Sequence, residues 1–274
     1  MAGAVSFERQ ADALGGAPLS KATISVAWLA FFFLIMPSLI VIPMSFGELN
    51  EIYFPPRSLS VVLYEEYFFE STWMETTAQS FRVGILSTLL SLFFGTTAAY
   101  GVVRSDIPGK KLFVVCLLSP MFMPHIVTAL GLYIYMSILH VQGTTASLIM
   151  GHTLLTTPFV MVIVMAGLRG VDPNLESAAK IMGAGRIYTF RKVTLPLLTP
   201  SLVVASLITF LLSFDELIIA IFLSGFGTHT LPVKMYENVT EEVSPVLAAI
   251  SVLLTLLAFV ICVSITKLEK AKPQ

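Results

Sequence analysis

Six apolar runs, each long enough to cross a bilayer, constrain this chain more than any other feature. A helix needs roughly 20 apolar residues to span the hydrocarbon core. Of the 274 residues, 56% are hydrophobic and only 12% are charged, whereas soluble domains carry about 25% charged residues. We therefore predict an all-α membrane protein with six transmembrane helices. The expected spans are Ala22–Phe46, Val83–Val103, Leu112–Leu139, Ala146–Leu168, Leu197–Leu223 and Val246–Ile265.

The distribution of basic residues predicts the orientation. Of the 16 Lys and Arg residues, 13 lie before the first run, after the last run, or in the segments 104–111 and 169–192. Because cytoplasmic loops are enriched in Lys and Arg, we expect both termini and the segment 172–200 to be cytoplasmic. The expected divisions are a cytoplasmic N-terminal segment (1–21), a membrane domain (22–265) and a cytoplasmic tail (266–274). The apolar spans make membrane lipid a partner, and the net charge of −1 gives no reason to expect nucleic-acid binding.

Segment 172–200 is a polar, basic island between two apolar runs. Asp172 is a typical N-cap, and Pro173 suits the first helical position. Gly183 and Gly185 favour a helix end, since glycine accepts the left-handed C-cap conformation. Helical spacing predicts one apolar face, made of Leu175, Ala178, Ala179 and Met182. That face either packs on loops of the same protein or docks a soluble partner.

The segment resembles the EAA loop of permease subunits of ATP-binding-cassette importers. That family's pattern is E-A-A, three residues, Gly, nine residues, Ile, one residue and Leu-Pro. The matching positions in this sequence hold Ser177-Ala178-Ala179, Gly183, Val193 and Leu195-Pro196, while Glu176 lies one place before the pattern's Glu. The residues that the resemblance implies in ATPase coupling are Glu176, Ser177, Ala178, Ala179, Met182, Gly183, Arg186, Leu195 and Pro196.

The resemblance implies the fold of a type I importer permease in a bacterial inner membrane. The sequence has no GxxxxGK[ST] phosphate-binding loop, so we expect a non-catalytic subunit that binds neither cofactor nor metal. In this family, ATP and Mg²⁺ are held by a separate ATPase. The implied partners are two ATPase subunits, a second permease subunit that is homologous rather than identical, and an extracytoplasmic substrate-binding protein.

Two acidic residues, Asp215 and Glu216, interrupt the fifth apolar run. An ionised carboxylate near the bilayer centre costs about 2.5–3.5 kcal/mol on insertion scales. Since none of the six runs contains Lys or Arg, the two acids either pair across a helix interface or face water and a cationic ligand. We expect them to line a substrate pathway together with Phe214, which precedes them, and His125, which follows Pro124 in the third run.

Several motifs are similar to those of the polyamine branch of these permeases. They are Ser213-Phe214-Asp215-Glu216, Thr230-Leu231-Pro232-Val233-Lys234 and Gly95-Thr96-Thr97-Ala98-Ala99-Tyr100. The resemblance implies a small cationic solute, similar to putrescine or spermidine. Permeases for iron(III) and for aminophosphonate or amino acid-type solutes remain alternatives. A different class, an ion-coupled secondary carrier using Asp215 and Glu216, should show inverted repeats, which we do not find in the sequence.

Overall fold

A computed structural model describes residues 21–49, 53–105, 108–241 and 243–270. The predicted cytoplasmic segment 1–21 therefore lies outside the described residues except for Lys21, and the predicted tail 266–274 is described only as far as Lys270, the last residue of a helix. Within the described ranges the chain is helical, with no strand beyond an isolated bridge between Gly143 and Ser224. The all-α prediction is confirmed.

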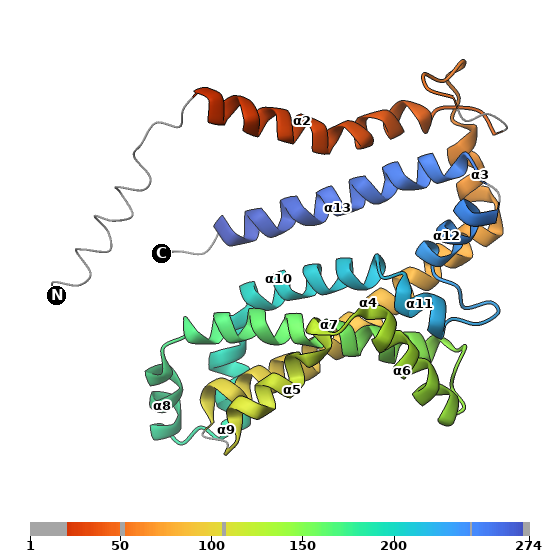
Figure 1. The fold of residues 1–274 in the computed structure, drawn as a ribbon. Coiled ribbons are helices and arrows are strands. Elements are labelled where there is room, and N and C mark those ends of the chain that lie inside the picture. The colour runs from red at the N-terminus through yellow and green to blue at the C-terminus, as the bar shows by residue number, and fades with distance from the viewer. Residues whose placement is uncertain (1–20, 50–52, 106–107, 242, 271–274) are drawn as a thin grey trace.

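The helices follow one another along the chain as the colours of Figure 1 run from red to blue. They are α2 (Lys21–Met44), α3 (Val62–Phe69), α4 (Ser71–Arg104), α5 (Lys110–Phe122), α6 (His125–Ile138), α7 (Thr145–Arg169), α8 (Pro173–Ile181), α9 (Arg186–Thr189), the π-helical turn η1 (Phe190–Thr194), α10 (Leu195–Phe214), α11 (Ile218–Leu223), α12 (Leu231–Glu241) and α13 (Val246–Lys270).

Five of the described helices are long and apolar enough to cross a membrane, and a bent pair gives a sixth candidate. The bent pair is α5 and α6, whose axes differ by 103°. The predicted continuous span Leu112–Leu139 is therefore wrong. Pro124 explains the break, because proline lacks an N–H and disfavours the helical conformation in the residue before it. Met123 is accordingly extended, with φ −83° and ψ 143°.

The fifth apolar run is also interrupted. We predicted one span over Leu197–Leu223, but the helix ends at Phe214 and the short α11 begins at Ile218. The second span starts earlier than predicted, at Thr72 instead of Val83. These differences have one cause: hydropathy reports where a chain is apolar, whereas helix ends depend on which groups satisfy the terminal backbone N–H and C=O groups.

The centre of the bundle is formed by α4 and α7, which pack along their lengths, with α10 against both. Helix α2 packs against α13, at the edge of the molecule (Figure 1). Two glycines allow the close approach of the central helices. A Cβ on Gly95 of α4 would lie 2.7 Å from Cβ of Val160, and one on Gly167 of α7 would lie 2.4 Å from Oγ of Ser201.

The helices alternate in direction, so the short segments gather at the two ends of the bundle. In Figure 1, α8 and α9 lie at one end, near the last residues of α4, and α13 also ends on this side of the molecule. The helices α3, α11 and α12 lie at the opposite end. The basic segments 104–111 and 169–192 are consequently at the same end of the molecule.

Gly95→Ala should destabilise the protein, because the added methyl group meets Val160 and the backbone N of Met161 at 3.1 Å. Overpacking of a well-filled core costs about 1–3 kcal/mol. The matched control is Gly131→Ala in α6, where nothing lies within 4 Å of an added Cβ. Thermal unfolding of the detergent-solubilised protein measures both. Equal unfolding midpoints for the two variants would show that α4 and α7 do not pack as described.

Candidate functional site

Helix α8 has well-defined ends, as the sequence predicted. The Asp172 side chain accepts a hydrogen bond from the backbone N–H of Asn174 at 2.9 Å, and Pro173 occupies the first turn. Gly183 has φ +87°. The N–H of Gly183 donates to the C=O of Lys180 and the N–H of Ala184 to that of Ala179, both at 3.0 Å. This bond pattern is a Schellman C-cap.

The exposed face of α8 differs from the predicted one in part. Leu175, Ala178 and Met182 are exposed as expected, with Met182 at 82%. Ala179 is instead buried and faces its own subunit. Ile181, which the periodicity did not select, is 87% exposed. An apolar surface is therefore present on α8, but it is rotated towards Ile181.

The exposed surface extends onto α9. Ile187 and Tyr188 are 77% and 61% exposed, and neither was predicted from the sequence. We call the apolar set the α8–α9 ridge; it consists of Leu175, Ala178, Ile181, Met182, Ile187 and Tyr188. Four exposed cations lie in the same segment, namely Lys180, Arg186, Arg191 and Lys192. Ser177 and Pro196 are exposed and Leu195 is half-buried.

The ridge is joined to the membrane bundle by continuous helix. Arg186–Phe214 forms one helix of 29 residues through α9, η1 and α10. Within η1 the N–H of Leu195 donates to the C=O of Phe190, five residues earlier. A wider π turn leaves room for Pro196, whose ring would otherwise press on the carbonyl four residues before it. The Leu-Pro pair therefore continues the helix instead of ending it.

Glu176 does not lie on the ridge. Its side chain is buried, with 3% of the residue exposed, and Arg104 Nε donates to its Oε1 at 3.0 Å. The Glu176 carboxylate is turned into its own subunit, so its place in the predicted coupling set is not that of an exposed docking residue. The pairing is invisible in the local sequence because Arg104 lies in the second span.

Asp215 and Glu216 lie in the break between α10 and α11, not within a continuous helix. Asp215 is exposed and follows the last residue of α10. Its side chain has no hydrogen bond or ion pair with any described residue. Glu216 is buried, and its Oε1 accepts the N–H of Ile219 at 2.8 Å. The carboxylate thus satisfies a backbone donor that the broken helix leaves without a carbonyl.

His125 supplies the in-chain partner that the sequence did not reveal. Its Nδ1 lies 3.5 Å from Oε2 of Glu216, and the ring is 44% exposed at the side-chain level. His125 is the first residue of α6, and α6 packs against α11. Two helix breaks, one after Phe122 and one after Phe214, therefore meet at a single histidine–carboxylate pair. The structure brings Asp215, Glu216 and His125 to one end of the bundle.

Phe214 is not exposed beside them. It is buried, and its ring lies 5.1 Å from that of Phe81 and 5.6 Å from that of Phe210, measured between centroids. Leu231 and Ile250 belong to the same core cluster. In this structure Phe214 packs in the core, while the other three residues of the predicted pathway set, the two acids and His125, lie together.

A buried polar network lies directly before the break. Ser213 Oγ is 2.9 Å from Ser87 Oγ and 2.8 Å from Nδ1 of His152. These contacts join α10 to α4 and α7. His152 is fully buried, so it holds helices together and does not line an open cavity. Ser213 could be singled out in the sequence because it lies two residues before Asp215. Its partners, Ser87 and His152, could not, because they belong to distant spans.

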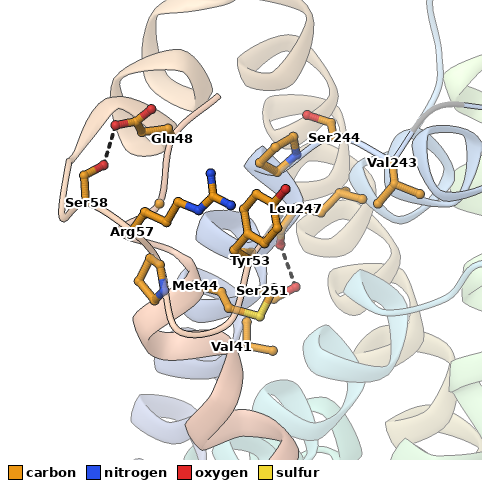
Figure 2. Close-up of a pocket in the computed structure, with 14 residues that line it drawn as sticks. Val41, Met44, Glu48, Tyr53, Arg57, Ser58, Val243, Ser244, Leu247 and Ser251 are labelled. Atoms are coloured by element: carbon orange, nitrogen blue, oxygen red, sulfur yellow. Dashed lines mark hydrogen bonds between the residues drawn. The ribbon is translucent and has the colours of Figure 1, made fainter. Parts of the chain in front are cut away.

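A cavity of about 230 Å³ lies between the end of α2, residues 53–58 and the start of α13. Figure 2 shows Val41, Met44 and Leu247 in its lining, with Arg57 above the ring of Tyr53 at 4.2 Å. The hydroxyl of Ser58 donates to Glu48. Asp215 and Glu216 do not line this cavity, and it is therefore distinct from the candidate pathway.

Comparisons with known proteins place the chain among importer permeases. It is 29% identical over 238 residues to the putrescine transport system permease protein PotI of Escherichia coli K12, which covers 84% of each chain. It is 29% identical over 191 residues to the spermidine/putrescine transport system permease protein PotC of the same strain, covering 70% of this chain and 72% of that one.

The fold matches a solved transporter subunit over nearly its whole length. A chain in the crystal structure of a bacterial ABC transporter involved in the import of alginate superposes with a TM-score of 0.75, at 16% identity, over 94% of this chain and 97% of that chain. The sequence pattern of one family matches residues 91–268. The chain belongs to the family of binding-protein-dependent transport system inner membrane components.

Proposed function

We propose that this inner-membrane permease subunit forms part of the pathway for a small cationic solute and is driven by a separate ATPase that docks on the α8–α9 ridge. The ridge carries the proposal. It presents large apolar side chains, among them Ile181 and Met182, beside the exposed cations Lys180 and Arg186. Exposed apolar patches rimmed by polar residues are typical of protein interfaces.

The basic residues at this end of the molecule predict the orientation of the protein in the membrane. The ridge belongs to segment 169–192, and segment 104–111 begins at the same end of the molecule. Together the two segments hold eight of the 16 Lys and Arg residues. The positive-inside rule then places the ridge in the cytoplasm, the compartment that holds ATP. The break at Asp215 lies at the opposite, extracytoplasmic end.

The partners proposed are those of a complete importer. Two ATPase subunits carry ATP and Mg²⁺, and a second, homologous permease completes the pathway. An extracytoplasmic binding protein delivers the solute to the end that carries Asp215. This chain contributes no catalytic group to ATP hydrolysis. An ion-coupled carrier, in contrast, would need no ATPase, so purification of the complex from its native membrane distinguishes the two by whether an ATPase accompanies the chain.

The substrate class follows from the carboxylates. Asp215 is exposed, has no partner among the described residues and lies next to Glu216 at a helix break. Non-helical backbone at membrane depth is tolerated where it lines a water-filled cavity or is buried in protein. A carboxylate in such a place favours a cation. The names of the relatives PotI and PotC specify putrescine and spermidine. We therefore propose a polyamine as the solute.

A second candidate is a solute that carries both an ammonium and an anionic group, such as an aminophosphonate or an amino acid. The half-exposed ring of His125 favours it, because it lies 3.5 Å from Glu216 and close to the break that holds Asp215. A protonated histidine can contact an anionic group while Asp215 contacts the ammonium. Thermal-shift screening of the cognate binding protein against polyamines, amino acids, aminophosphonates and iron(III) chelates decides between these solutes.

Coupling is proposed to be mechanical. Closure of the ATPase pair moves α8, and the helix Arg186–Phe214 carries that movement to the break at Asp215, because η1 and Pro196 leave the helix uninterrupted. The break then opens to the extracytoplasmic side and accepts solute from the binding protein.

Asp215→Asn should reduce uptake at limiting solute in proteoliposomes that contain the complete transporter. A hydrogen bond to a charged group contributes about 1.5–3 kcal/mol, which corresponds to about tenfold or more in affinity. The matched control is Glu75→Gln, an exposed carboxylate near the start of α4, at the same end of the molecule. Unchanged uptake by Asp215→Asn would remove the carboxylate from the pathway.

Gly183→Ala should weaken coupling between ATP hydrolysis and uptake. The positive φ of Gly183 strains any residue with a Cβ by about 1–2 kcal/mol, although an added Cβ has open space around it. The control is Gly185→Ala, where φ is −67° and an added Cβ also meets nothing. The ratio of solute transported to ATP hydrolysed is the readout. If both variants transport normally, the ordered end of α8 is not needed for coupling.

A further inference from the structure

Glu176 is the centre of a buried hydrogen-bond network. Its Oε1 accepts from Arg104 Nε and from Thr194 Oγ1, both at 3.0 Å. Its Oε2 accepts from the hydroxyl of Tyr100 at 3.3 Å. The donors come from α4 and η1, whereas the carboxylate belongs to α8. The Glu176 side chain therefore connects α8, α4 and η1 at the end of the bundle that carries α8 and α9.

Arg104 extends the network to the end of α7. Its Nη2 donates to the C=O of Leu168 at 3.2 Å and to that of Val171 at 2.8 Å. Leu168 lies in the last turn of α7 and Val171 just beyond its end, so the guanidinium binds two carbonyls at this helix end while its Nε holds Glu176. The Arg104 side chain is 13% exposed and that of Glu176 4%. This ion pair is thus shielded from solvent screening.

The network connects α8 to α4 through side chains, in addition to the backbone connection between α8 and α10. Along the backbone, α8 is linked through α9 and η1 to α10. The described elements that pack most closely on α8 are again η1 and α9. Helix α4, in contrast, is the long central helix that packs along α7. The Glu176 carboxylate therefore joins the docking helix to a part of the bundle that the backbone route does not reach directly.

We infer that Glu176 is a positioning residue that transmits the movement of α8 to α4 through Arg104, in parallel with the covalent route through α10. This inference rests on the proposed function, because it assumes that an ATPase moves α8. Glu176 acts from inside its own subunit and does not touch the ATPase. The residue occupies the position just before the one where the family pattern has its Glu, and Ser177 at the pattern position is exposed.

Docking and coupling are thereby assigned to different residues. The α8–α9 ridge binds the ATPase, and the Glu176–Arg104 pair carries movement into α4. Loss of the pair should leave the ridge available, so the ATPase still binds and still hydrolyses ATP. Uptake per ATP should fall, since α4 would lose its direct side-chain link to α8 and would follow only through its packing against α10.

The test uses the complete transporter in proteoliposomes with Glu176→Gln, Arg104→Gln and the double variant. Removing one partner leaves a buried charge without compensation, whereas removing both does not. The single variants should therefore unfold at lower temperature, and the double variant should recover much of that loss. Solute transported per ATP should stay lowered in all three, by about fivefold or more, the lower end of typical coupling between sites.

Two milder variants keep the test valid if a charge variant does not assemble. Tyr100→Phe and Thr194→Val each remove one donor to Glu176 and leave the ion pair intact; each should lower uptake per ATP by a smaller factor. The control is Asn174→Ala, an exposed position on the same helix, which should change nothing. The amount of ATPase that co-purifies is measured for every variant.

The outcomes distinguish the inference from the proposed function. If the double variant recovers stability and also normal uptake per ATP, Glu176 is merely structural and the inference is wrong. If the single variants lose bound ATPase while the ridge is intact, Glu176 contributes to docking, which also overturns it. If no ATPase accompanies the wild-type chain, the proposed function itself fails.

Discussion

The continuous helix from Arg186 to Phe214 is the constraint on which the functional account depends. Its 29 residues correspond to about 43 Å at 1.5 Å per residue, enough to cross the membrane and extend beyond it. Because the helix is unbroken, the exposed residues Ile187 and Tyr188 and the acidic break at Asp215 belong to one rigid element. The π turn of η1 preserves this continuity at Pro196, where proline would otherwise kink or end a helix.

The second constraint is that backbone polar groups need partners within an apolar bundle. Each helix break satisfies it with local chemistry. At the break after Phe214, Glu216 accepts the N–H of Ile219, and His125 lies on the other side of the same carboxylate. At the end of α7, Arg104 donates to the carbonyls of Leu168 and Val171. The polar side chains at these helix ends are also among the candidate functional positions.

Local sequence signals predicted the two ends of α8. The boundaries of α8 could be predicted because Asp172, Pro173 and Gly183 cap the helix through contacts with residues close to them in the sequence. Its exposed face was only partly predictable, since Ala179 and Glu176 turn inward to partners far along the chain. The partners of Glu176 could not be read from the local sequence for that reason.

The breaks in the third and fifth runs were harder to predict, because average hydropathy stays high through them. Pro124 was visible in the sequence, and its effect depends on whether neighbouring groups compensate for the missing N–H. The pairing of His125 with Glu216 joins two runs whose relative placement only the fold supplies. Phe214 was placed in the pathway by its neighbours in sequence, while the structure packs it with Phe81 and Phe210.

The most direct test of the account is thiol labelling of the ridge with and without the ATPase. Single cysteines are introduced at Met182 and, as a buried reference, at Ala179, in a chain whose two exposed native cysteines, Cys116 and Cys262, are replaced by serine. We predict that a cysteine at 182 reacts rapidly in the isolated permease and becomes protected when the ATPase binds. Unchanged labelling at 182 in a complex that hydrolyses ATP and imports solute would contradict the account.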